Sequence, residues 1–80
     1  MIHFDALAAG YVRERQWHPS QKLTDLSGGG LELRVTLVSS VELERFVLAW
    51  AEHAQVVAPP ERRNRLEGRL KAARKAYDTA

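Results

Sequence analysis

Residues 31–37, which read LELRVTL, alternate apolar and polar side chains without interruption and constrain the fold more than any other segment. Successive side chains of a β-strand point to opposite faces, so the leucines and the valine face a core and the polar residues face away. Three glycines at 28–30 precede this segment, and glycine supplies the positive φ angles of a tight turn. Residues 21–26 are the expected partner strand, with Leu23 as its inward residue. The sequence therefore predicts a β-hairpin.

A strand and a helix are predicted before the hairpin. Ile2 and Phe4 alternate with a polar residue and form a short strand, which Asp5 follows as a good N-cap. Helical spacing then predicts one apolar stripe along the helix, made of Leu7, Ala8, Tyr11 and Val12. Pro19 disfavours helical geometry at His18, so this helix ends before that residue.

Two helices and one strand are predicted after the hairpin. Ser39 and Glu42 have the spacing of a capping box, which begins an amphipathic helix. Its expected apolar face is Leu43, Phe46, Val47, Trp50, Ala51 and Ala54. Residues 55–58 form a short strand, and Pro60 opens the last helix. The last helix is expected to dock by a stripe of Leu66, Leu70, Ala73 and Tyr77, with Tyr77 as its anchor.

The predicted order of elements is strand, helix, strand, strand, helix, strand, helix. This order corresponds to an α+β protein with a ferredoxin-like βαββαβ antiparallel sheet, both main helices on one face, plus an extra C-terminal helix. Eighty residues leave no room for two independent cores, so residues 1–80 are expected to form a single domain.

Composition argues against several classes of function. The chain has no cysteine, and its histidines at positions 3, 18 and 53 are dispersed, so we expect no metal site and no cofactor. The serines occupy caps and turns, and the glycine run precedes a strand where a phosphate-binding loop would precede a helix. We therefore expect no catalysis. Without a long apolar run or a signal peptide, we expect a cytoplasmic protein with no membrane contact.

Charge is distributed unevenly along the chain. Residues 59–80 carry seven basic and three acidic side chains, whereas residues 1–58 carry five basic and seven acidic ones. The basic residues surround the last helix, which indicates a solvated helix with favourable pairs Glu61–Arg65 and Glu67–Lys71. The predicted outward positions of the sheet offer no aromatic ring apart from His3, which disfavours recognition of single strands by base stacking.

Residues 14–23, ERQWHPSQKL, place an indole and an imidazole before a proline in a connection between elements. We predict that Trp17 closes the seam between the first helix and the hairpin. The alternative is that this connection contacts an effector or a second subunit. The candidate contact residues are Arg13, Arg15, Trp17, His18 and Arg34.

The run YVRERQWHPSQ at residues 11–21 resembles the C-terminal extension (WCX) domain of bacterial WYL-domain, helix-turn-helix transcriptional regulators. The resemblance continues through the alternating strand, the helix end FVLAW at 46–50, the VVAP at 56–59 and the final helix. The chain departs from the pattern at residues 51–53, AEH, where members of the family usually have a glycine.

This resemblance implies a non-catalytic regulatory domain that serves dimerisation, effector response or both. It implies that the chain is a C-terminal fragment of a longer regulator, which would contact DNA through a missing N-terminal domain. The implied partners are a second copy of the chain or a neighbouring WYL domain, and the implied effectors are nucleotides or single-stranded nucleic acid. An alternative hypothesis is a sensor of small anions, nucleotides or single-stranded nucleic acid that uses Arg13, Arg15, His18 and Arg34.

Overall fold

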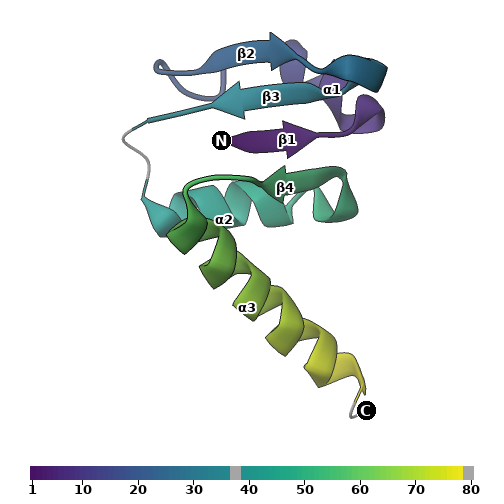
Figure 1. Cartoon of the computed structure of the whole chain (residues 1–80), viewed down its shortest axis with the longest axis vertical. Helices are drawn as coiled ribbons and strands as arrows, with labels where there is room; N and C mark the ends of the chain where they lie inside the picture. The colour runs from purple at the N-terminus through teal and green to yellow at the C-terminus, as the bar shows by residue number, and fades with distance from the viewer. Residues whose placement is uncertain (37–38, 79–80) are drawn as a thin grey trace.

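A computed structural model describes residues 1–36 and 39–78 and contains a four-stranded antiparallel sheet (Figure 1). The strands are β1 (Ile2–Phe4), β2 (Lys22–Asp25), β3 (Leu31–Arg34) and β4 (Ala54–Val56). The helices are α1 (Ala6–Arg13), α2 (Ser40–Leu48) and α3 (Pro60–Asp78), with short 3₁₀ turns η1 (Ser27–Gly29) and η2 (Ala51–His53).

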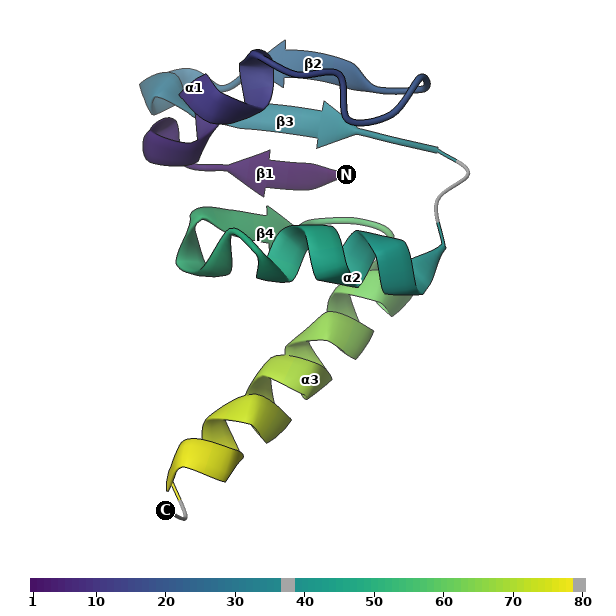
Figure 2. The same cartoon turned by 180° about the vertical axis from the view of Figure 1, so that it is seen from behind.

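The strand order β2-β3-β1-β4 confirms the predicted ferredoxin-like arrangement. Helix α1 connects β1 to β2, and α2 connects β3 to β4, so each helix joins two strands that have another strand between them. Both helices lie on the same side of the sheet, as predicted (Figure 2). Helix α3 is the predicted addition, and it runs away from the sheet. Among the described residues, no helix is long and apolar enough to cross a membrane.

The hairpin forms where the alternating segment predicted it. Leu31 and Leu33 are buried, whereas Leu37 lies outside the described residues. Leu23 pairs with Leu33, but it remains 38% exposed because β2 is an edge strand. The turn requires glycine, since φ is 78° at Gly28 and 85° at Gly29.

Helix α1 packs by part of the predicted stripe, since Ala8 and Val12 are buried but Leu7 and Tyr11 are not. Asp5 is its N-cap, as expected, and accepts a 3.1 Å hydrogen bond from the Ala8 N–H. The buried residues are Ala8, Ala9 and Val12, whereas Leu7 and Tyr11 are 62% and 64% exposed. Small side chains on the inner face let α1 lie close to the sheet, so the prediction that Leu7 and Tyr11 are core residues is wrong.

Helix α2 begins as predicted and ends early. The Ser39 hydroxyl accepts a 3.1 Å hydrogen bond from the Glu42 N–H, and Leu43 and Val47 are buried. The helix ends at Leu48. The predicted apolar face continues beyond it to Ala51, which is in η2, and Ala54, which begins β4.

The first half of helix α3 contacts the body of the domain. Leu66 is buried, whereas Leu70 is 51% and Tyr77 84% exposed. Figure 1 shows that the helix projects away from the sheet, which accounts for the exposure of Leu70 and Tyr77. The prediction that Tyr77 anchors this helix is therefore wrong.

A buried carboxylate on α2 holds the first half of α3. Glu44 is only 3% exposed, and its Oε1 lies 3.3 Å from Arg65 Nε and 3.8 Å from Arg69 Nη1. Glu67 forms the predicted pair with Lys71 at 3.2 Å, but Arg65 reaches Glu44 where the sequence predicted a pair with Glu61. Arg65 thus joins α3 to α2 in addition to being part of a solvated helix.

A histidine–carboxylate contact joins the start of α1 to the start of β4. His53 Nδ1 lies 2.6 Å from Asp5 Oδ2, and the Asp5 N–H donates to the His53 carbonyl at 3.1 Å. The hydrogen bond that His53 donates to the Asp5 carboxylate raises the pKa of His53 above its usual 6.5. The same bond, followed by the one from the Ala8 N–H, lowers the pKa of Asp5 below 3.8.

We predict that His53→Gln destabilises the domain more at about pH 5 than at about pH 8. The raised pKa of His53 gives stability that is complete below the unfolded value and lost as pH rises through the folded value. The lowered pKa of Asp5 gives stability that is present above its ordinary value and lost in acid. Urea denaturation of both proteins at the two pH values measures the difference. Asp5→Asn keeps an N-cap oxygen and should remove the same pH dependence; an equal effect of His53→Gln at both pH values would contradict the prediction.

Candidate functional site

The five candidate contact residues do not form one cluster. Arg15, Trp17 and His18 lie together in the connection between α1 and β2, where the Arg15 guanidinium lies 5.7 Å from the centre of the Trp17 ring. Arg13, at the end of α1, pairs with Asp25 of β2 at 2.6 Å. Arg34 is on the opposite face of the sheet from the buried Leu31 and Leu33.

Trp17 is part of the core. Its indole N–H donates a 3.0 Å hydrogen bond to the Val12 carbonyl at the end of α1. Its ring centre lies 5.1 Å from that of Phe46 and 6.2 Å from that of Trp50, both on the segment that includes α2. Trp17 therefore packs against the core from the connection between α1 and the hairpin, where it was predicted to close the seam, and it also joins α1 to the α2 segment.

Ser20 and Gln21, which the sequence did not single out, hold the connection in place. The Ser20 hydroxyl lies 2.7 Å from His18 Nδ1 and accepts a 2.9 Å hydrogen bond from the Thr36 N–H. The Gln21 side-chain carbonyl accepts hydrogen bonds from the N–H groups of Trp17 and His18. Ser and Gln directly after a proline are the available signal, because short polar side chains commonly bond to the backbone of turns.

A shallow pocket of about 190 Å³ adjoins this connection. It is lined by Trp17, His18, Leu33, Val35, Glu42, Leu43 and Phe46. The lining is mostly apolar, and its one carboxylate would repel a phosphate. This pocket is therefore a poor match for the anionic ligand that the arginines suggested.

The face of the sheet that no helix covers is polar and carries a group of charged and polar side chains around Arg34 on β3. Glu32 lies between His3 and Arg34, 3.0 Å from His3 Nε2 and 2.9 Å from Arg34 Nε. These two hydrogen bonds, with His3 first, lower the pKa of Glu32 below 4.5. Lys22 lies directly opposite Arg34 in the β2–β3 ladder. Like charges in that position repel, so an anion between them would relieve the repulsion.

Neither area resembles a metal centre in the part of the chain that the structure describes. No group of three or more His, Asp or Glu side chains there could hold a metal ion. The polar groups of the open face are instead bound to each other: His3 of β1 contacts Glu32 across the strands, and Glu32 pairs with Arg34 along β3.

We predict that Trp17→Ala lowers the free energy of unfolding by about 3 kcal/mol. This value is at the lower end of the range for replacing a core tryptophan by alanine, because the Trp17 side chain is only partly buried. Trp17→Phe keeps the aromatic contacts and loses the hydrogen bond to Val12, so we expect a loss of about 1 kcal/mol. Urea denaturation of the three proteins tests both values. A Trp17→Ala protein as stable as the wild type would mean that the indole is free for a partner.

Comparison with known proteins identifies the family. The model of the WCX domain family matches residues 1–74, which is all but the last six residues of the chain. A search of curated proteins finds no match. The matched residues include the whole sheet, α1, α2, the connection that holds Trp17, and most of α3. The chain therefore belongs to the WCX domain family, a family of regulatory domains.

Proposed function

We propose that this WCX domain is a non-catalytic domain of a cytoplasmic, DNA-binding transcriptional regulator and that it acts by pairing with a second copy of itself. The observation that supports pairing is the edge strand β2. All four of its residues are exposed, and it ends the sheet on one side. An exposed edge strand is a template for another strand. Most soluble homo-oligomers have closed symmetry, which an antiparallel pair of identical edge strands satisfies.

The ladder determines how a second copy would pair. The Leu26 N–H donates to the Gly30 carbonyl at 2.9 Å, so alternate residues of β2 bond inward to β3. The backbone groups of Leu23 and Asp25 therefore point away from the sheet. In a symmetric antiparallel pair centred on Leu23, this half-exposed leucine would meet its own copy on the helix side of the sheet.

The remaining parts of the regulator would lie elsewhere in the parent protein. A winged-helix domain would read the DNA, and a WYL domain beside this one is the alternative partner for the open edge. Nucleotides or single-stranded nucleic acid are the proposed effectors. The domain itself would transmit pairing or effector binding to the DNA-binding part, with no cofactor.

We predict that the isolated domain forms dimers at concentrations up to hundreds of micromolar and that Leu23→Lys weakens them at least tenfold, because an edge lysine opposes strand addition. The matched control is Gln55→Lys, which adds the same charge to an exposed position of the other edge strand, β4. Light scattering and sedimentation equilibrium measure the dissociation constants. Strictly monomeric wild-type protein would contradict self-pairing, and a greater effect of Gln55→Lys would place the contact on β4.

A second candidate function is the sensing of a small anion, a nucleotide or single-stranded nucleic acid on the open face of the sheet. Its support is the pair of opposed cations, Lys22 and Arg34, beside an Arg34–Glu32 ion pair. The Arg34 side chain is 59% exposed and can reach a phosphate oxygen from this position. Arg13 and His18, which the sequence also suggested, are engaged by Asp25 and Ser20.

If this second function is correct, Arg34→Ala should weaken binding of short single-stranded DNA or of linear and cyclic dinucleotides about tenfold, the usual effect of losing one charged contact. Arg15→Ala is the comparison, because Arg15 lies in the connection beside Trp17. Titration calorimetry at low salt gives both affinities. Binding that neither variant changes would exclude these arginines, and a selective loss in Arg15→Ala would move the site to the connection.

A further inference from the structure

The projecting half of α3 carries apolar side chains that the domain does not cover. Leu66, Leu70, Ala73 and Tyr77 lie on one stripe of the helix, at spacings of four, three and four residues. Leu66 is buried, but Leu70 is 51% and Tyr77 84% exposed. A stripe that begins in the core and continues into solvent is typical of an interaction surface.

A groove continues this stripe onto the body of the domain. It has a volume of about 260 Å³ and lies between the end of α2, β4 and the first half of α3. Leu66 and Leu70 line it from α3, and Val47 and Leu48 line it from α2. Leu48 is also 37% exposed. The groove and the stripe therefore form one apolar surface that bends around the angle between α3 and the body.

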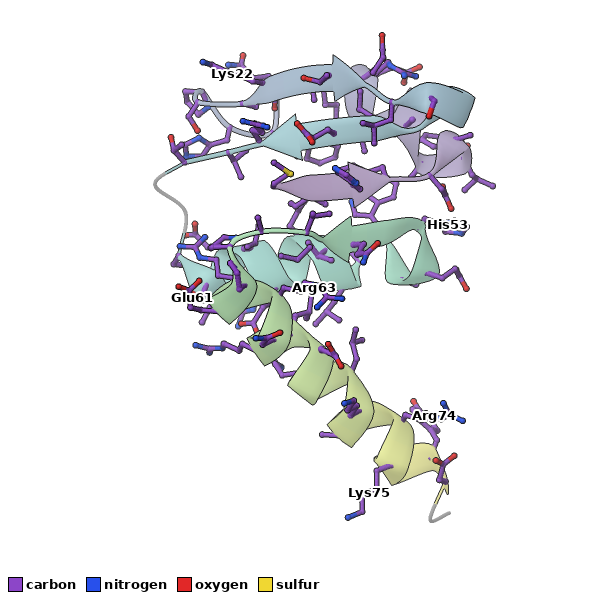
Figure 3. All side chains as sticks on the ribbon, in the orientation of Figure 1. Lys22, His53, Glu61, Arg63, Arg74 and Lys75 are labelled. Carbon is purple, nitrogen blue, oxygen red and sulfur yellow. The ribbon has the colours of Figure 1, made fainter. Side chains whose placement is uncertain are left out.

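Arginines flank this surface on both sides. At about 100° per residue, Arg63 and Arg74 lie on one side of the stripe and Arg69 on the other, each within about 80° of its centre. Each pairs with a carboxylate at a long distance, 3.9 Å for Arg63 and 3.8 Å for Arg69 and Arg74. Figure 3 places Arg63 near the body and Arg74 on the projecting half. The pairs of Arg63 and Arg74 are long and exposed on both sides, so they are weak and can be exchanged for a partner's carboxylates, whereas Arg69 faces the buried Glu44.

Helix α3 presents these side chains in a fixed direction. The buried Glu44 carboxylate lies 3.3 Å from Arg65 Nε, and Leu66 is buried one residue further along the helix. Both contacts are in the first half of α3, so the second half extends from a defined base. A preformed surface of this kind loses little conformational entropy on binding.

We propose that the stripe of α3 and the adjoining groove bind an amphipathic helix with an acidic rim from another protein. Charge complementarity selects this partner: residues 59–80 have a net charge of +4, from seven basic and three acidic side chains. Two copies of α3 side by side would repel each other. Nucleic acid is disfavoured because the centre of the surface is apolar, and phosphates would leave Leu70 and Tyr77 in water. This proposal is independent of pairing through β2.

The test uses a synthetic amphipathic peptide of about 18 residues, long enough to form a helix, with leucines on one face and glutamates beside them. A second peptide has lysine at every glutamate position. Titration of isotope-labelled domain, followed by NMR, should show shifts confined to residues 66–77 and the groove. The acidic peptide should bind at least tenfold more tightly than the basic one, a difference that decreases with salt. Equal affinity of the two peptides, no binding of the acidic peptide, or shifts outside this surface would overturn the proposal.

The matched variants are Tyr77→Ser and Tyr11→Ser. Both tyrosines lie exposed on helices, at 84% and 64%, so neither substitution should unfold the domain, which circular dichroism verifies. Tyr77→Ser should weaken binding of the acidic peptide about tenfold, whereas Tyr11→Ser should leave its affinity unchanged. Equal losses in the two variants would overturn the proposal. Self-association of the domain that Tyr77→Ser abolishes would also overturn it. Tighter binding of a short DNA duplex to α3 than of the acidic peptide would do the same.

Discussion

The fold depends on a cluster of aromatic rings that joins three segments far apart in the sequence. Phe4 of β1 lies 6.0 Å from Phe46 and 5.8 Å from Trp50, and Trp17 lies 5.1 Å from Phe46, all measured between ring centres. Each such pair stabilises a core by about 0.5–1.5 kcal/mol beyond the burial of its surface. Because the rings come from β1, from the α1–β2 connection and from the α2 segment, the cluster keeps both helices on one face.

This arrangement separates the domain into two chemically different faces. The aromatic rings and the buried leucines pack between the sheet and the helices. The open face therefore carries charged and polar side chains such as His3, Glu32 and Arg34. Trp17 and Arg34 therefore belong to different surfaces, although the sequence suggested them for one site. A single ligand of ordinary size cannot contact both, and the open face and the connection are separate hypotheses about effector binding.

Sequence patterns predicted the elements that depend on local rules. Alternation located β3, the glycines located the turn, and Ser39 marked the start of α2. Sequence patterns failed where packing between elements determines which side chains are buried. Helical spacing predicted an α1 stripe of Leu7, Ala8, Tyr11 and Val12, but the sheet is close enough to α1 to accept only alanines and a valine, so Leu7 and Tyr11 are exposed.

The candidate site was less predictable for the same reason. Their residue types indicated that Arg34 and Trp17 could contact a ligand or partner. Only the strand pairing and the ring contacts show that they lie on opposite sides of the sheet. The buried Glu44 had no sequence signal, because its burial comes from the packing of α3 across α2 and not from its own helix.

Glu44 also explains how a helix with so few apolar contacts keeps its direction. Burying a carboxylate is costly, and an ion pair often does no more than offset that cost, so Glu44 contributes orientation more than stability. The helix instead draws stability from within, through pairs such as Glu67–Lys71 at 3.2 Å. A charge buried at its base disfavours other docking angles, since any of them would leave Glu44 without Arg65. Helix α3 is therefore held specifically and not strongly, which suits a segment whose far half serves a partner.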